Sequence, residues 1–425
     1  TAYLLRNDLL NAGVRELLLA AARVVLSNRR GTLAEQVERV FDEKPLPPPR
    51  VRSLAAVAKQ DATPADLPTL EFANSFGGFT ADGREYAIVM ENGQLTPAPW
   101  VNVIANPDFG FQVSSGGAGF TWASNSQQNQ ITAWSNDPVT NESSEMLYIR
   151  DLDTGEVWSP TAYPMRDPQS RYVAYHGHGY SRFEHVSHGI GIELTQFVPI
   201  SDPVKISRLK LINRTGRARR LSITAYVEWT LGPNRAKSQP YIATEIDTLT
   251  SAMFAQNPWS EDFGRRVAFL DMQGRQTGWT GDRREFLGRN GSPEKPAGLM
   301  ADTPFSMRTG AGLDPCGALQ TEIRIAPGAE AEIAITLGQS ENRADAQALI
   351  ARTRSANLDA QLAQVNAFWD EALGTIEVKT PDRSMDLMLN RWLLYQTLAC
   401  RMWARAGFYQ ASGAYGFRDQ LQDCM

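Results

Sequence analysis

The chain has 425 residues, a formal net charge of -5 and 42% hydrophobic residues, the composition of ordinary globular domains. Its length corresponds to about two or three domains. Because acidic residues outnumber basic ones and no polybasic run occurs, the composition excludes nucleic acid as a partner. Three widely spaced cysteines without a CxxC pair argue against disulfides and structural zinc and favour a cytoplasmic location.

The first 44 residues are predicted to be helical. Apolar residues recur with a period near 3.6 from Leu5 to Val25, and Arg29–Gly31 closes this run. A shorter helix is expected from Leu33 to Phe41. The longest apolar stretch, residues 17–26, is shorter than the roughly 20 residues that span a bilayer, so a membrane segment is expected only upstream of this sequence.

Residues 45–68 are rich in proline and alanine and are predicted to form a linker. Between residues 69 and 338, short β-type runs are separated by turn residues. The clearest strand alternates from Leu221 to Leu231, and we expect it to pair with Val204–Ile212. A second hairpin is expected around Pro327–Gly328. This pattern predicts a large antiparallel sandwich or barrel.

Helical periodicity returns after Gly338. Residues 339–375 are predicted to be a helical linker, and residues 376–425 the start of a helical domain. Its first helix carries apolar residues from Met385 to Trp403 and follows the N-cap signature Thr380–Asp382. The sequence stops soon afterwards and begins without Met, so we interpret it as an interior piece of a longer protein.

The segment from Gly416 to Cys424 concentrates polar groups near the end of the chain. Its arginine, carboxylates and amides suit the hydroxyl groups of a sugar, and the candidate substrate ligands are Arg418, Asp419, Gln422 and Asp423. An ordinary helix start, with Asp419 as its cap and Arg418 in a surface pair, is an equal alternative from these residues alone.

Two other segments carry candidate ligands. The segment between Gly93 and Asn136, taken as a loop, holds tryptophan and asparagine side chains that could stack on and bond a sugar ring, although roles in turns and in the core are favoured. Four histidines fall between His176 and His188. Their spacing could supply a metal site, but the glycines among them favour strand and loop histidines, and no metal is expected.

Seven segments, in this order, resemble the glycoside hydrolase family 94 region of the cyclic β-1,2-glucan synthases. The resemblance runs from about residue 65 to the end and is specific because several long motifs recur together. The segments are residues 71–79 (EFANSFGGF), 82–86 (DGREY), 96–106 (TPAPWVNVIAN), 134–137 (WSND), 310–316 (GAGLDPC), 390–396 (NRWLLYQ) and 416–423 (GFRDQLQD).

The resemblance implies a β-supersandwich, a helical linker and an (α/α)6 barrel. It also implies an inverting phosphorylase-type enzyme that acts on β-glucan with inorganic phosphate as co-substrate and needs no other cofactor. Arg418 and Asp419 would bind the non-reducing glucosyl unit, with Gln422 and Asp423 nearby. The general acid is expected beyond residue 425, so this piece alone should be inactive.

The resemblance to the synthases implies a membrane-embedded glycosyltransferase part upstream of this sequence. It also implies a phosphorylase part that lies on the cytoplasmic side of the inner membrane and adjusts the length of the glucan chain. Two alternatives remain at this point: a soluble 1,2-β-oligoglucan phosphorylase and a non-catalytic carbohydrate-binding sandwich. Oligomeric state, monomer or homodimer, also stays open.

Overall fold

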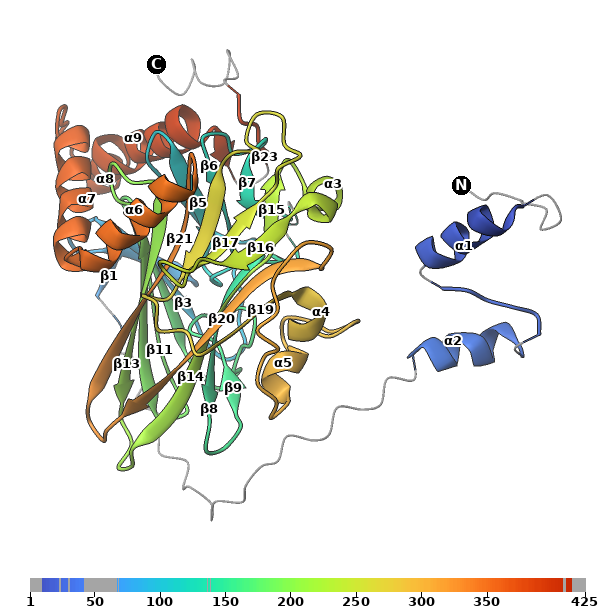
Figure 1. Cartoon of the computed structure of the whole chain (residues 1–425). Helices are drawn as coiled ribbons and strands as arrows, with labels where there is room; N and C mark the ends of the chain where they lie inside the picture. The colour runs from blue at the N-terminus through green and yellow to red at the C-terminus, as the bar shows by residue number, and fades with distance from the viewer. Residues whose placement is uncertain are drawn as a thin grey trace. The chain divides into compact units, whose positions relative to one another are not determined.

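The computed structural model describes residues 10–22, 24–29, 31–41, 67, 69–135, 137, 139–407 and 410–414. The chain forms two compact units, Thr1–Pro48 and Pro49–Met425. The predicted linker, residues 45–68, lies outside the described residues apart from residue 67. The first unit holds two helices, α1 (Ala12–Ala21) and α2 (Leu33–Phe41) (Figure 1).

Both helices of the first unit start at side-chain caps. The Asn11 side chain accepts a 2.8 Å hydrogen bond from the backbone N–H of Val14. At α2, the Thr32 N–H donates to Glu35 Oε2 and the Glu35 N–H donates to Thr32 Oγ1, which forms a capping box. The second helix confirms the prediction. The first ends at Ala21, so its predicted continuation towards Arg29 is wrong, in keeping with the low helix propensity of the β-branched valines that follow.

The second unit is a large β-sandwich, and its strands pair antiparallel throughout. One layer is an eleven-stranded sheet, and the facing layer consists of two five-stranded sheets. In sheet order, the large sheet contains β1 (Leu70–Glu71), β2 (Gly77–Thr80), β3 (Glu85–Met90), β10 (Tyr172–Gly177), β11 (Tyr180–Ser187), β12 (Ile190–Phe197), β13 (Val204–Asn213), β21 (Glu330–Ser340), β18 (Val267–Asp271), β17 (Met253–Gln256) and β16 (Ala243–Ile246).

The two smaller sheets complete the sandwich. One contains β19 (Gly278–Asp282), β20 (Pro315–Ile325), β14 (Arg219–Val227), β8 (Glu145–Asp151) and β9 (Val157–Trp158). The other contains β15 (Trp229–Gly232), β7 (Gln130–Thr132), β6 (Gly119–Ala123), β5 (Phe109–Ser114) and β4 (Val101–Ala105).

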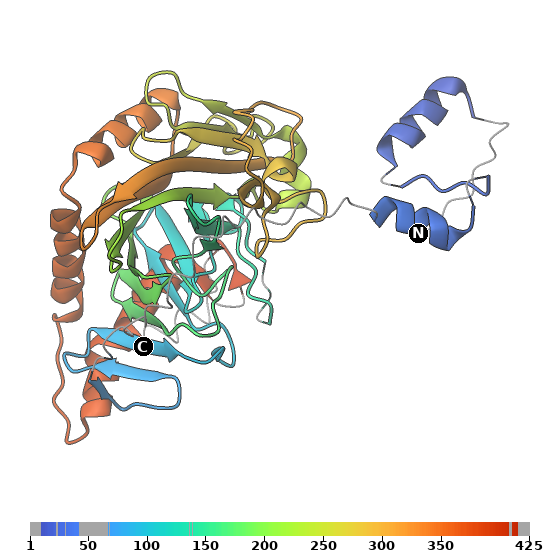
Figure 2. The same cartoon turned by 90° about the horizontal axis from the view of Figure 1, so that it is seen from below.

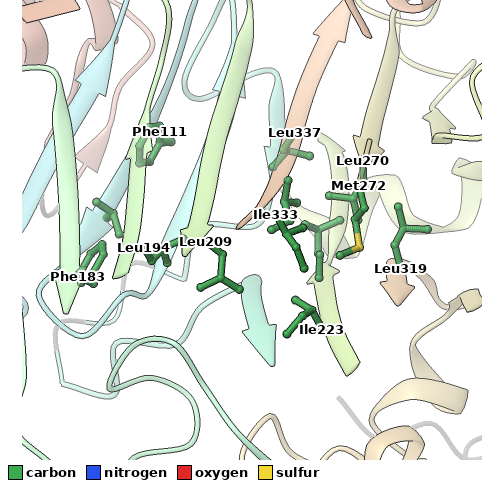
Figure 3. Packing of buried hydrophobic residues seen from close by; sticks show 14 of the residues in the cluster. Phe111, Phe183, Leu194, Leu209, Ile223, Leu270, Met272, Leu319, Ile333 and Leu337 are labelled. Atoms are coloured by element: carbon green, nitrogen blue, oxygen red, sulfur yellow. The ribbon is translucent and has the colours of Figure 1, made fainter. Parts of the chain in front are cut away.

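The main core lies between the layers (Figure 3). Leu194, Leu209 and Ile333 enter it from the large sheet, and Ile223 and Leu319 from the facing sheet. Each is almost fully buried, and burying such a side chain contributes roughly 1.5–3 kcal/mol. The strand periodicity therefore predicted the sandwich correctly.

Both predicted hairpins are wrong. Strand β13 pairs with β12 and β21, whereas β14 pairs with β8 and β20, so the connections β13–β14 and β20–β21 each cross from one layer to the other. Asn213 ties the two crossings together. Its Nδ2 donates to the carbonyls of Arg217, Ile325 and Ala326, and its own carbonyl accepts from the Gly328 N–H.

Helices cover the outer face of the large sheet (Figures 1 and 2). Helix α6 (Arg343–Ser355) packs Leu349 and Ile350 on Phe254 and Phe269, and α7 (Leu358–Leu373) follows. The next helical run is α8 (Arg383–Leu387), η3 (Met388–Trp392), α9 (Leu393–Gln396) and η4 (Thr397–Ala404), in which η3 and η4 are π-helical.

The predicted N-cap at Asp382 is confirmed, because its carboxylate accepts from the Ser384 N–H at 2.9 Å. Among the described helices, none combines the length and the apolar character that crossing a bilayer requires. The remaining short elements are α3 (Arg235–Ser238), η2 (Gln239–Tyr241), α4 (Arg283–Phe286), α5 (Ala297–Met300), β22 (Ala406–Gly407) and β23 (Gln410–Ala411).

Candidate functional site

The predicted substrate ligands Arg418, Asp419, Gln422 and Asp423 lie outside the described residues, and their role stays a prediction. The structure does describe the segment that leads to them. This segment consists of the helical run from Arg383 to Ala404 and the hairpin β22–β23, and it rests on the sandwich.

The hairpin is anchored to the loop that joins β6 and β7. Asn125 Nδ2 donates to the Gly413 carbonyl at 3.0 Å, and the Arg405 guanidinium donates to the Ser124 carbonyl at 2.9 Å. The backbone N–H groups of Ser412 and Gly413 both donate to the Arg405 carbonyl. The sandwich therefore fixes the chain five residues before Arg418.

Gly413 is required at this contact. Its φ is +63°, a region that favours glycine, and a Cβ added there would lie 2.1 Å from Asn125 Oδ1. Any larger residue would therefore strain the backbone and push the hairpin away from the loop.

Tyr395 fastens the helical run to the sandwich. Its buried hydroxyl donates to Asn102 Oδ1 at 2.9 Å and accepts from the Gly179 N–H at 3.0 Å. Asn102 Nδ2 in turn donates to the carbonyls of Gly177 and Tyr180. Burial raises the pKa of the Tyr395 hydroxyl, which therefore remains a neutral donor.

Two glycines allow the helices to approach the sandwich loops closely. A Cβ on Gly83 would lie 2.2 Å from Leu387, and one on Gly179 would lie 2.3 Å from Trp369 Nε1. The Gly83 carbonyl accepts a 3.1 Å hydrogen bond from Trp392 Nε1. Tyr395 and both glycines were not predicted as contact residues, although Tyr395 and Gly83 lie within the motifs at residues 390–396 and 82–86.

Ion pairs link the same elements at their surface. Asp370 on α7 accepts from Arg84 of the sandwich at 2.6 Å and from Arg391 of the helical run at 3.3 Å. Burial acts to raise the pKa of the Asp370 carboxyl, but the two arginines outweigh it and hold that pKa below its ordinary value. Arg383 likewise pairs with Glu71 at 2.7 Å.

A cavity of about 400 Å³ lies between the sandwich and the helical run. Its lining includes Trp100, His176, Met388 and Tyr395, and no carboxylate lies among the described lining residues. The most deeply buried carboxylates of the described residues, Asp151, Asp247 and Asp271, are each paired with an arginine.

The segment from Gly93 to Asn136 is not a loop as predicted, because it contains strands β4 to β7. Trp122 is buried in a cluster under the hairpin, and the Asn129 amide donates to the Ala123 carbonyl and to Gln339. Asn106 likewise bonds backbone carbonyls. The favoured roles in turns and core are confirmed for these residues, while Asn136 lies outside the described part.

The histidines lie in strands and turns, as favoured. His176 is in β10 and His185 is in β11, whereas His178 and His188 follow these strands in turns. Burial lowers the pKa of His176 and of His178 to about 4, so both are neutral near pH 7. Over the described residues, no group of three His, Cys, Asp or Glu side chains is arranged to hold a metal.

Two protein-family models match the chain, one over the sandwich and one over the helical run and the segment after it. Residues 84–356 match the supersandwich domain of glycosyl hydrolase 94, and residues 368–425 match the catalytic domain of the glycosyl hydrolase 94 superfamily. The first match covers the sandwich from β3 onward together with α6, and the second begins within α7.

Curated relatives fall into two groups. The cyclic β-(1,2)-glucan synthase NdvB of Rhizobium meliloti (strain 1021) is 38% identical over 100% of this chain and 15% of its own length. Solabiose phosphorylase of Paenibacillus borealis is 30% identical over 82% of this chain and 45% of its own. N,N'-diacetylchitobiose phosphorylase of Vibrio proteolyticus is 27% identical over 82% and 44%. The chain thus spans less than half of each relative.

Proposed function

Because the chain belongs to glycoside hydrolase family 94, we propose that it is the phosphorylase-type region of a cyclic β-1,2-glucan synthase, acting on β-1,2-glucan chains with inorganic phosphate. One observation carries the choice of synthase. The similarity to the Rhizobium synthase covers the whole chain, whereas the similarity to the two phosphorylases covers 82% of it. The synthase match therefore includes the helices before the sandwich.

The proposed reaction is an inverting phosphorolysis. A carboxylic acid protonates the glycosidic oxygen while phosphate attacks the anomeric carbon from the opposite face, so phosphate takes the place of the base and water of an inverting hydrolase. In this proposal, Arg418 and Asp419 hold the non-reducing glucosyl unit, and Gln422 and Asp423 bond hydroxyl groups nearby. The general acid belongs to a barrel segment after residue 425.

The anchored hairpin supports this assignment. Catalysis requires the sugar to be held in one geometry, and ligands on a fixed segment achieve this at a lower entropic cost than mobile ones. Asn125, Arg405 and Gly413 fix the backbone just before the motif. In the proposed full-length protein, this region lies on the cytoplasmic side of the inner membrane and adjusts glucan length before ring closure.

The test is an assay of the full-length protein with linear β-1,2-glucan, with and without phosphate. We expect phosphate-dependent release of glucose 1-phosphate in the α configuration, because inversion at a β-linked anomeric carbon gives the α product. Release of free glucose without phosphate, or no release, would contradict the proposal. Activity in a soluble fraction free of membrane would instead favour a 1,2-β-oligoglucan phosphorylase.

A further inference from the structure

An exposed pair of aromatic rings stands out on the sandwich. All ten tryptophans of the sequence are described, and Trp259 is the one that is exposed, with 73% of its surface accessible. Tyr241 beside it is 44% exposed. Their ring centroids are 5.2 Å apart and their planes differ by 13°, so the two rings stack in parallel at the surface.

The fold holds this pair in place. Strands β16 and β17 form a hairpin in which Ala243 pairs with Gln256, so Tyr241, just before β16, and Trp259, just after β17, meet at one end. The side chain of Asn257 donates to the Leu231 carbonyl at 2.9 Å and accepts from the Trp259 N–H at 3.2 Å. The stack is therefore preorganised rather than carried on a free loop.

Its chemistry suits a neutral sugar ring. An exposed indole offers a flat apolar surface to the C–H face of a pyranose, and carboxylates accept hydrogen bonds from hydroxyl groups. Two exposed carboxylates, Glu261 and Asp262, lie two and three residues after Trp259. These charges disfavour a polyanion and are atypical of the core of a protein interface, where charged residues are depleted.

We infer that Tyr241 and Trp259 form a secondary binding site for a β-glucan chain, on elements separate from the helical run and hairpin that lead to Arg418. The choice of glucan rests on the proposed function. A glucan chain that binds at the aromatic pair and at the proposed substrate site around Arg418 at the same time gains affinity through effective concentration. A short oligosaccharide cannot reach both sites and gains nothing. This site would retain long chains between reaction cycles.

The test compares Trp259→Ala and Tyr241→Ala with Leu249→Ala in the chain. Leu249 is 74% exposed and lies at the opposite end of the β16–β17 hairpin, so it controls for loss of an exposed apolar side chain. Affinity electrophoresis in gels with long β-1,2-glucan should show binding weakened about tenfold by Trp259→Ala and unchanged by Leu249→Ala. Trp259→Tyr should retain most of the binding.

Equal retardation of Trp259→Ala and the parent chain, at matched thermal stability, would overturn the inference. So would a change in oligomeric state on size-exclusion chromatography without a change in glucan binding, because the pair would then contact a second copy. If Trp259→Ala weakens binding of β-1,3-glucan and the parent chain does not bind β-1,2-glucan, the aromatic binding site is confirmed. The β-1,2-glucan substrate of the proposed function is then contradicted.

Discussion

Tyr395→Phe should loosen the helical run Arg383–Ala404 from the sandwich. The substitution keeps the ring and removes the hydroxyl, which leaves Asn102 Oδ1 and the Gly179 N–H without the partner they have now. Each buried polar group left unpaired costs roughly 1–3 kcal/mol. The adjacent cavity of about 400 Å³ can admit water, which offsets part of this cost. We therefore expect a loss of about 2 kcal/mol in unfolding free energy.

Tyr148→Phe is the matched control. Tyr148 is also fully buried, and its hydroxyl donates to the Pro293 carbonyl at 2.9 Å, in a cluster separate from the helical run. Urea unfolding gives the loss of stability, and amide hydrogen exchange locates it. Exchange over residues 383–404 should rise in Tyr395→Phe and stay at the parent level in Tyr148→Phe.

Equal amide exchange over residues 383–404 in both variants would refute the reasoning. So would a loss of unfolding free energy below about 0.5 kcal/mol in Tyr395→Phe, because a single hydrogen bond already contributes about that much. The helical run would then be held mainly by its aromatic and apolar contacts.

Three further predictions follow from the charged and titratable groups. In the full-length protein, Asp419→Asn should lower the rate of glucose 1-phosphate release by about 30- to 1,000-fold at unchanged thermal stability. A near-normal rate would contradict substrate binding by Asp419 and favour the alternative that it caps a helix. His176 and His178 have folded pKa values of about 4, because burial disfavours their charged forms. Below pH 6.5 the unfolded chain therefore takes up protons that the folded chain does not, and stability should fall by up to about 1.4 kcal/mol per pH unit for each histidine until pH 4. Urea titrations at pH 7, 6 and 5 check this, and a flat profile would contradict it. Lys205 pairs with Glu145 at 2.7 Å inside the sandwich, so Lys205→Ala should cost about 3–5 kcal/mol by leaving the buried carboxylate without a cation, bonded only to the hydroxyl groups of Thr121 and Thr132. The double variant Lys205→Met with Glu145→Gln should cost much less, and an equal loss in urea unfolding would contradict the claim that the uncompensated charge is the main cost.

Local patterns in the sequence were sufficient for the element types. Alternating apolar residues predicted the sandwich, and the 3.6-residue period with the Asp382 cap predicted the final helical run, because both signals depend on neighbours within a few residues. The family resemblance rested on several motifs in order, and matches over residues 84–356 and 368–425 confirm it. The substrate motif stood out by its polar residues and received its roles from that resemblance, and those roles remain a prediction.

The partners of the strands and of the polar side chains were decided by the tertiary structure. The turn after Asn213 looks like a hairpin turn, but β13 and β14 enter opposite layers, and alternation is the same whichever layer a strand joins. Asn102 and Asn129 look like sugar ligands in the sequence, yet each is buried and bonded to groups far along the chain. An amide side chain suits a ligand and a buried contact equally well, so its role depends on which distant groups the fold brings within hydrogen-bonding distance.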